Sequence, residues 1–241
     1  MRALDVAAFA VDAGLYAAFG LLLFYIIPIT APGLGTVRFW PQVIIPAVFA
    51  VLFGPWVGGF GAAVGIFIND MAIHGNPLLS LMAGVTSNFA MFFIIGYVAN
   101  KRLDWKIPML SFGIISALLV WIAFAFVSTI ELAWLAAGLV IGSYIVLLCF
   151  VWRTPKWRGY EVGSMIGLLV GSAIIGAMVP LFTQFFIMPG ATGLTPYSVA
   201  AGFGYVIWTF TTEIPFLLVL GPPILQACYQ AYPSLKPKTS E

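Results

Sequence analysis

Charged and amide side chains are rare in this sequence, so the places where they gather stand out. Only 7% of the 241 residues are charged, while 62% are apolar. One cluster holds Arg38 and Trp40 and, further along the chain, Asn69, Asp70 and His74. A guanidinium, a carboxylate and an amide beside an indole ring could bind a polar small molecule, or they could form an interfacial belt of solvated loop residues. His74 is the single histidine and has no HExxH pattern, so we expect no metal site.

A second set of polar groups lies inside apolar segments. Asn88 is midway along one such segment, and Gln184 is near the end of another. In the last apolar segment, Glu213 follows a stripe of residues at the spacing of one helix face. The stripe consists of Tyr205, Trp208, Thr209 and Thr212. An aromatic stripe is typical of helix packing, whereas a glutamate and an amide at membrane depth indicate a cavity.

The first apolar segment carries small residues spaced by four. Two such pairs are Ala3 with Ala7 and Ala13 with Ala17, and the longest run is Ala10, Gly14 and Ala18. Small residues at this spacing let helix backbones approach closely in a membrane. The run therefore favours either packing within this chain's own bundle or docking of another membrane subunit. Asp12 lies beside it, where a carboxylate is costly unless it is paired or faces water; it would also suit the positive end of the helix dipole.

The sequence lacks the short motifs that mark common catalytic sites. It contains no Walker lysine motif, no GxGxxG after a strand, no GxSxG elbow and no paired acidic or histidine motif of a membrane hydrolase. We therefore expect no enzyme activity, no cofactor and no ATP hydrolysis by this chain alone. A formal net charge of +2 gives no indication of nucleic acid as a partner.

The composition predicts an all-α polytopic membrane protein, because a water-soluble fold could not cover so much apolar surface. A membrane helix needs roughly 20 apolar residues. On that measure the chain has about eight spans, near 7–29, 42–54, 56–71, 78–100, 107–129, 132–152, 161–188 and 197–228. The second and third are short and flank a glycine- and proline-containing turn over 54–59. A single helix through 42–71 would be about 45 Å long, more than the bilayer thickness, so a hairpin is favoured, with a re-entrant pair as the alternative.

The basic residues give an orientation for these spans. With the N-terminus in the cytoplasm, the positive-inside rule places the Lys and Arg clusters at 101–106 and 153–158 on the inner side. Arg38 is the exception among the ten basic residues. We therefore expect one multi-pass domain of the cell membrane over 1–232, with both ends cytoplasmic and a short polar cytoplasmic tail over 233–241.

Part of the sequence resembles a known transporter family. The pattern consists of Val37-Arg38-Phe39-Trp40-Pro41, then Leu52-Phe53-Gly54-Pro55-Trp56-Val57-Gly58-Gly59, then Gly65-Ile66-Phe67-Ile68-Asn69-Asp70. It resembles the core of the substrate-binding S-components of energy-coupling-factor (ECF) vitamin transporters, and the alanine-rich first segment is similar to theirs. The resemblance covers residues 1–100 and, more weakly, 200–228. That family typically has six helices, so the spans over 107–152 would be an inserted hairpin.

The resemblance implies a function and a site. A small organic, vitamin-like micronutrient would bind near the outer face, under the loop that bears Arg38 and Trp40. The other lining candidates would be Asn69, Asp70, Asn88, Gln184, Trp208 and Glu213. A transmembrane coupling subunit would dock on the first helix at Ala10, Gly14 and Ala18, and two cytoplasmic ATPases would supply the energy for import.

Two other functions fit the same residues. The chain could be a structural or accessory subunit of a larger membrane complex, with its polar groups only joining helices. It could also be a stand-alone secondary transporter, in which Asp12, Glu213 or Asp70 would be the ion-coupling carboxylate. A hydrated outward cavity lined by Trp40, Asp70 and Trp208 would favour the binding subunit, and a dry, filled bundle would favour the accessory role.

Overall fold

The computed structural model describes residues 3–30, 38–101, 103–104, 106–126, 130–153 and 155–235. Within these ranges the chain is helical and has no strand, apart from an isolated β-bridge between Thr30 and Arg38. The bridge brings the two ends of the first loop together, and the Phe39 N–H donates to the Ile29 carbonyl at 2.9 Å. The predicted all-α fold is confirmed.

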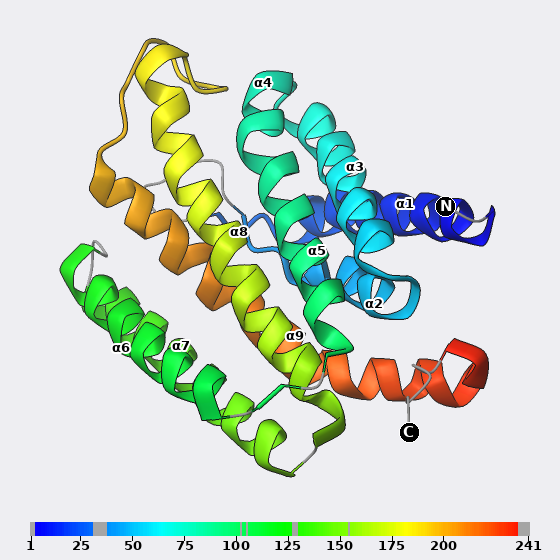
Figure 1. Cartoon of the computed structure of the whole chain (residues 1–241). Helices are drawn as coiled ribbons and strands as arrows, with labels where there is room; N and C mark the ends of the chain where they lie inside the picture. Colours follow the sequence, from blue (N-terminus) through cyan, green and yellow to red (C-terminus); the bar gives the residue numbers. More distant parts are fainter. Residues whose placement is uncertain are drawn as a thin grey trace.

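The helices follow one another along the chain, with the longer connections after α1 and after α8 (Figure 1). The first half of the chain contains α1 (Ala3–Ile26), η1 (Pro41–Val43), α2 (Ile44–Phe53), α3 (Pro55–Ile73), α4 (Pro77–Leu79), η2 (Ser80–Val85) and α5 (Thr86–Ala99). The second half contains α6 (Lys106–Phe126), α7 (Ile130–Arg153), η3 (Pro155–Trp157), α8 (Arg158–Phe185), α9 (Val199–Ala231) and η4 (Pro233–Leu235).

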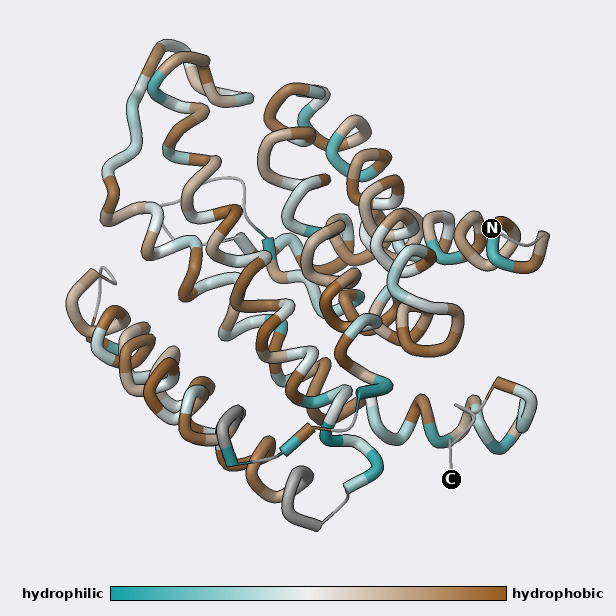
Figure 2. The backbone as a smooth tube through the Cα atoms, in the orientation of Figure 1, coloured by the Kyte–Doolittle hydropathy of each residue, from teal (hydrophilic) through white to brown (hydrophobic). Residues whose placement is uncertain are grey.

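Seven of the described helical stretches are long and apolar enough to cross a membrane. They are Ala3–Ile26, Pro55–Ile73, Pro77–Ala99, Met109–Phe126, Ile130–Cys149, Pro155–Phe185 and Val199–Ala231. The stretch Pro41–Phe53 is apolar but shorter. Figure 2 shows hydrophobic residues along these helices, and hydrophilic residues between α5 and α6 and at the start of α8. The stretches correspond to seven of the eight expected segments, and Pro41–Phe53 corresponds to the eighth, which was expected to be short.

A sharp turn at Gly54 separates α2 from α3. Gly54 has a φ of 105°, which residues with a side chain rarely adopt, and Pro55 begins α3. A Cβ on Gly58 would overlap Ala50, so α2 and α3 lie directly against each other. The break predicted within 42–71 is therefore confirmed.

Glycines let α8 pack closely on α5. One face of α8 carries Gly159, Gly163, Gly167 and Gly171. A Cβ on Gly163 would lie 3.1 Å from the Ile95 carbonyl oxygen, and one on Gly167 would lie 2.6 Å from that of Met91. Close backbone approach of this kind stabilises helix pairs in membranes, where no hydrophobic effect drives helices together.

The α6–α7 hairpin lies along one flank of the bundle, against α9 (Figure 1). Leu119 and Val140 are buried, whereas Ile114, Trp121 and Trp134 are exposed. The buried side chains of Leu119 and Val140 belong to the same core cluster as residues of α8 and α9.

The first helix presents two different faces. Tyr16 and Gly20 are buried, with Tyr16 against Gly65 and Gly20 against Asn69 of α3. Ala10, Gly14 and Ala18 are exposed, and no described atom outside α1 lies within 4 Å of a Cβ placed on Gly14. Packing within the described bundle is therefore wrong for Ala10, Gly14 and Ala18, whereas it holds for Ala13 and Ala17, which are buried.

Candidate functional site

A cavity lies between the first loop and the helices α3, α5, α8 and α9. Its lining consists of Arg38, Trp40, Ile66, Asp70, His74, Leu79, Ala83, Gly84, Asn88, Ile175, Val179 and Glu213. The cavity volume is about 100 Å³, enough for several water molecules. Polar groups face it from the loop, α3, α5 and α9, and aliphatic side chains come from α3 and α8.

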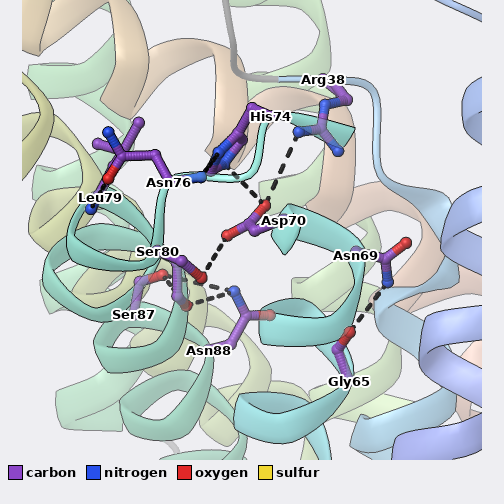
Figure 3. A network of polar contacts seen from close by, with 11 residues as sticks. Arg38, Gly65, Asn69, Asp70, His74, Asn76, Leu79, Ser80, Ser87 and Asn88 are labelled. Atoms are coloured by element: carbon purple, nitrogen blue, oxygen red, sulfur yellow. Dashed lines mark hydrogen bonds and ion pairs between the residues drawn. The ribbon is translucent and has the colours of Figure 1, made fainter. Parts of the chain in front are cut away.

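The end of α3 fixes the positions of Asp70 and His74. The helix stops at Ile73, and the N–H groups of His74 and Gly75 both donate to the Asp70 carbonyl at 2.9 Å. Gly75 has a φ of 66°, which lets the chain reverse. The Asn76 N–H then donates to His74 Nδ1 at 3.1 Å, which holds the imidazole in place (Figure 3).

The Asp70 carboxylate is the centre of the polar contacts (Figure 3). Ser80 Oγ donates to Oδ2 at 2.8 Å. Oδ1 faces Arg38 Nη2 at 3.7 Å and His74 Nε2 at 3.4 Å. Burial lowers the pKa of the Arg38 guanidinium from its ordinary value, and the neighbouring Asp70 carboxylate opposes that change. The guanidinium also lies 5.4 Å from the Trp40 ring centre, a cation–π distance.

A short π-helix, η2, brings its backbone close to Asp70. It covers Ser80–Val85, between α4 and α5. A Cβ on Gly84 would lie only 2.5 Å from Asp70 Oδ2, so a side chain there would push the carboxylate away. Single turns of π-helix occur frequently at functional sites, because they shift which side chains and carbonyls face inward.

A chain of hydrogen bonds connects the loop to α1 and α5. Trp40 Nε1 donates to the Tyr16 hydroxyl at 2.8 Å, and that hydroxyl donates to Asn88 Oδ1 at 2.7 Å. Asn88 Nδ2 in turn donates to the Gly84 carbonyl at 2.9 Å. These buried bonds hold the Trp40 indole over the cavity in one orientation, because its N–H donates to a hydroxyl that is itself fixed by Asn88.

Glu213 faces the cavity from the middle of α9. The residue is 5% exposed, and its Oε2 has no hydrogen-bond partner among the described atoms. Its neighbours in the cavity wall include the aliphatic side chains of Ile175 and Val179 on α8. A buried carboxyl oxygen without a partner is uncommon in folded proteins and usually indicates a function.

Three predicted site residues lie outside the cavity lining. Asn69 faces α1, where its Nδ2 donates to the Tyr16 carbonyl at 3.4 Å. Gln184 is exposed, and its Nε2 donates to the Tyr197 carbonyl at 3.2 Å, which ties α8 to the segment before α9. Trp208 is half-buried on a different face of α9 from Glu213. The structure therefore does not bring these three residues to the cavity.

Sequence reasoning missed Tyr16, Ser80 and Gly84. Tyr16 could have been found, because it stands four residues after Asp12 and four before Gly20 on a single helix face. Ser80 and Gly84 carry no such signal, because their proximity to Asp70 depends on the π-helix.

Asp12 lies apart from the cavity lining. It is fully buried in α1, and neither carboxyl oxygen has a hydrogen-bond partner among the described residues. A Cβ on Gly61 of α3 would overlap it, so the carboxyl sits directly on the α3 backbone.

Comparison with known proteins gives one informative similarity. The chain is 30% identical over 161 residues to a sodium/proline symporter of Haemophilus influenzae. The aligned region covers 63% of this chain but 30% of the symporter, so the chain matches less than a third of its relative's length. No family model and no solved structure matches. Together with the apolar helices, this similarity identifies a multi-pass helical membrane protein.

Proposed function

We propose that this chain is a membrane transport protein that binds a small organic molecule in the cavity beneath Arg38 and Trp40. The observation that carries the proposal is the convergence of these two residues with Asp70, Asn88 and Glu213 on one cavity. They come from the loop, α3, α5 and α9, which are far apart in the sequence. A few placed polar groups on an aromatic and aliphatic wall are typical of small-molecule sites.

The polar groups are not fully satisfied by one another, which favours ligand binding over an accessory role. Arg38 Nη2 stands 3.7 Å from Asp70, longer than a hydrogen bond, and Glu213 Oε2 has no partner among the described atoms. A cluster that only joined helices would be expected to satisfy its buried groups, as the bonds between Trp40, Tyr16 and Asn88 do.

Within this class, we propose a substrate-binding subunit of an ECF-type importer that captures a vitamin-like micronutrient at the outer face. Arg38 and Trp40 at the loop, the Gly54 turn and Asp70 near the end of α3 belong to the pattern that resembles the S-components. A transmembrane coupling subunit would dock on the exposed small-residue run of α1, and two cytoplasmic ATPases would drive import.

A sodium-coupled carrier is the second candidate, supported by the similarity to the sodium/proline symporter. Asp12 and Glu213 are buried carboxyls in spanning helices, where ion-coupling groups of carriers are found. In this case the chain would move its ligand without an ATPase.

Purification of the tagged chain from its native membrane in mild detergent separates the two candidates. The importer proposal expects a coupling membrane subunit and an ATPase pair to co-purify, with ATP hydrolysis in the preparation. The carrier proposal expects the chain alone, and uptake by proteoliposomes that requires a sodium gradient. Proteoliposomes that take up ligand under a sodium gradient without any ATPase would contradict the importer proposal.

A further inference from the structure

The charged groups of the cavity are unevenly distributed, and their positions indicate which kind of ligand would bind. Its lining contains the carboxyl groups of Asp70 and Glu213, the Arg38 guanidinium and the His74 imidazole. Arg38 and His74 both face Asp70 Oδ1, and Ser80 donates to Oδ2. The charged groups on the loop side of the cavity are thus directed at Asp70, and none of these contacts reaches Glu213.

Other hydrogen-bonding groups in and behind the cavity wall are bonded to one another. The Tyr16 hydroxyl donates to Asn88 and accepts from Trp40, and Asn88 Nδ2 donates to the Gly84 carbonyl. Glu213 Oε2 has no partner among the described atoms. Thr209, one turn earlier on α9, is fully buried and its hydroxyl also lacks a partner among them. These oxygens lie on the same side of the helix, because residues four apart share a face.

The ionisable side chains that act on the Tyr16 hydroxyl are carboxyl groups rather than cations. Glu213, Asp12 and Asp70 all lie within electrostatic range of the Tyr16 hydroxyl. Arg38, the described cation of the cavity, is at the Asp70 end. A carboxyl buried among apolar side chains is stabilised strongly by a cation or a charged hydrogen-bond donor beside it.

We propose that the ligand of this cavity is an organic molecule with a protonated nitrogen, which binds against Glu213 while its ring lies beneath Trp40. The inference rests on the proposed binding function and specifies its substrate class. The apolar side chains of Ile66, Ile175 and Val179 would contact the body of the ligand. A carboxylate elsewhere on the ligand would face Arg38, so a zwitterion fits as well as a simple amine.

A bare alkali ion fits these groups less well. Asn88 Oδ1 accepts from Tyr16, and Asp70 Oδ2 accepts from Ser80, so these two oxygens of the cavity wall already have protein partners. No group of three acidic, histidine or cysteine side chains in the described part of the chain could hold a metal ion. The cavity is also larger than a single ion requires.

Probes that share a ring system and carry a cationic, neutral or anionic substituent test the inference on the purified full-length chain. One set is pyridoxamine, pyridoxine and 4-pyridoxate, and a second is tryptamine, tryptophol and indole-3-acetate, each at equal concentration in potassium chloride. The measurement is the shift in melting temperature, because a ligand that binds the folded state alone raises it. We expect the amine of at least one set to raise the melting temperature more than its neutral and anionic relatives.

The variant Glu213→Gln should weaken apparent binding of that amine about tenfold or more, since a charge-assisted contact is lost. The control variant Glu131→Gln removes an exposed carboxylate on α7 and should leave binding unchanged. If Glu213→Gln does not fold, the order of the three probes on the unmodified protein still decides.

Three results would overturn the inference. Stronger stabilisation by the probes that carry a carboxylate would indicate that the ligand binds to Arg38 instead of Glu213. The proposed binding function would still stand. Stabilisation by sodium chloride over potassium chloride that disappears in Glu213→Gln would indicate an ion site. If none of the six probes stabilises a preparation that other metabolites do stabilise, the proposal of an amine ligand is refuted, and the proposed binding function still stands.

Discussion

Asp70 connects three parts of the chain that meet at the cavity. It ends α3 through its carbonyl, holds Ser80 of the π-helix through Oδ2, and faces Arg38 of the first loop through Oδ1. These contacts are buried, so their loss would leave polar groups unpaired in an apolar environment. The residue therefore shapes the cavity as well as lining it.

The variant Gly84→Ala should disturb this arrangement without removing any polar group. The new Cβ would lie 2.5 Å from Asp70 Oδ2, so the carboxylate must move away from Ser80 and Arg38. We expect the free energy of unfolding to fall by about 1–3 kcal/mol and ligand binding to weaken. Thermal or detergent-titration unfolding measures the first effect.

The matched control for that change is Gly142→Ala on α7, where no described atom outside the helix lies within 4 Å of the new Cβ. It should leave stability unchanged or raise it by up to about 1 kcal/mol. Equal effects of the two substitutions would show that Gly84 does not support Asp70.

Adjacent residues show why only part of the site could be predicted from the sequence. Arg38, Asp70 and His74 were expected together, because the loops that bear them flank the same hairpin. Asn69 and Asp70 are neighbours in the sequence, but successive side chains on a helix point about 100° apart. Asn69 consequently faces α1, and Asp70 faces the cavity. The sequence alone does not predict how α3 is rotated about its axis, so it could not show which of Asn69 and Asp70 faces the cavity.

At the scale of the elements, the two faces of α1 have different roles. Ala13 and Ala17 are buried in the bundle, whereas Ala10, Gly14 and Ala18 are exposed. Both sets are small and spaced by four, and the sequence did not distinguish them. The difference comes from which side of α1 meets α3.

The substitution Gly14→Leu should block assembly with a coupling subunit and leave the isolated chain folded, because a bulky side chain would keep the partner backbone away. Co-purification of the partner and the melting temperature of the isolated chain are the measurements. The matched change Ala17→Leu should instead lower the melting temperature, since Ala17 is 6% exposed and has no room for it. If Gly14→Leu assembles normally, the run is not a docking face.

The contact between α5 and α8 depends on glycines, which let the two backbones approach closely. Gly167→Val should destabilise the chain by about 1–3 kcal/mol, because its Cβ would lie 2.6 Å from the Met91 carbonyl oxygen. Gly138→Val on α7 adds the same side chain where no described atom outside the helix is near, and should cost much less. Comparable losses in unfolding experiments would contradict the packing described for α8.

Hydropathy located the helices well, because a spanning segment must be apolar along its whole length and satisfy its own backbone. The turn at Gly54 was predictable from its Gly-Pro pair. The π-helix Ser80–Val85 was not, because nothing in its local sequence distinguishes it from an α-helix. The cavity wall at Ala83 and Gly84 was therefore missed.

For the whole molecule, the positive-inside rule makes a definite prediction about orientation. In a background without Cys149 and Cys228, an impermeant thiol reagent added to intact cells should label Thr192→Cys, in the loop before α9. It should label Asp104→Cys, before α6, only after the cells are opened. Labelling of residue 104 from outside would contradict the arrangement with both ends in the cytoplasm.

Binding of a ligand in the cavity is the central claim, and thermal unfolding of the detergent-purified chain against a panel of vitamins and related metabolites tests it most directly. At least one compound should raise the melting temperature. The effect should weaken in Trp40→Ala, which removes the indole over the cavity, and persist in Trp121→Ala, which removes an exposed indole from α6. A well-folded chain that no compound stabilises, or one whose stabilisation is unchanged in Trp40→Ala, would contradict the claim.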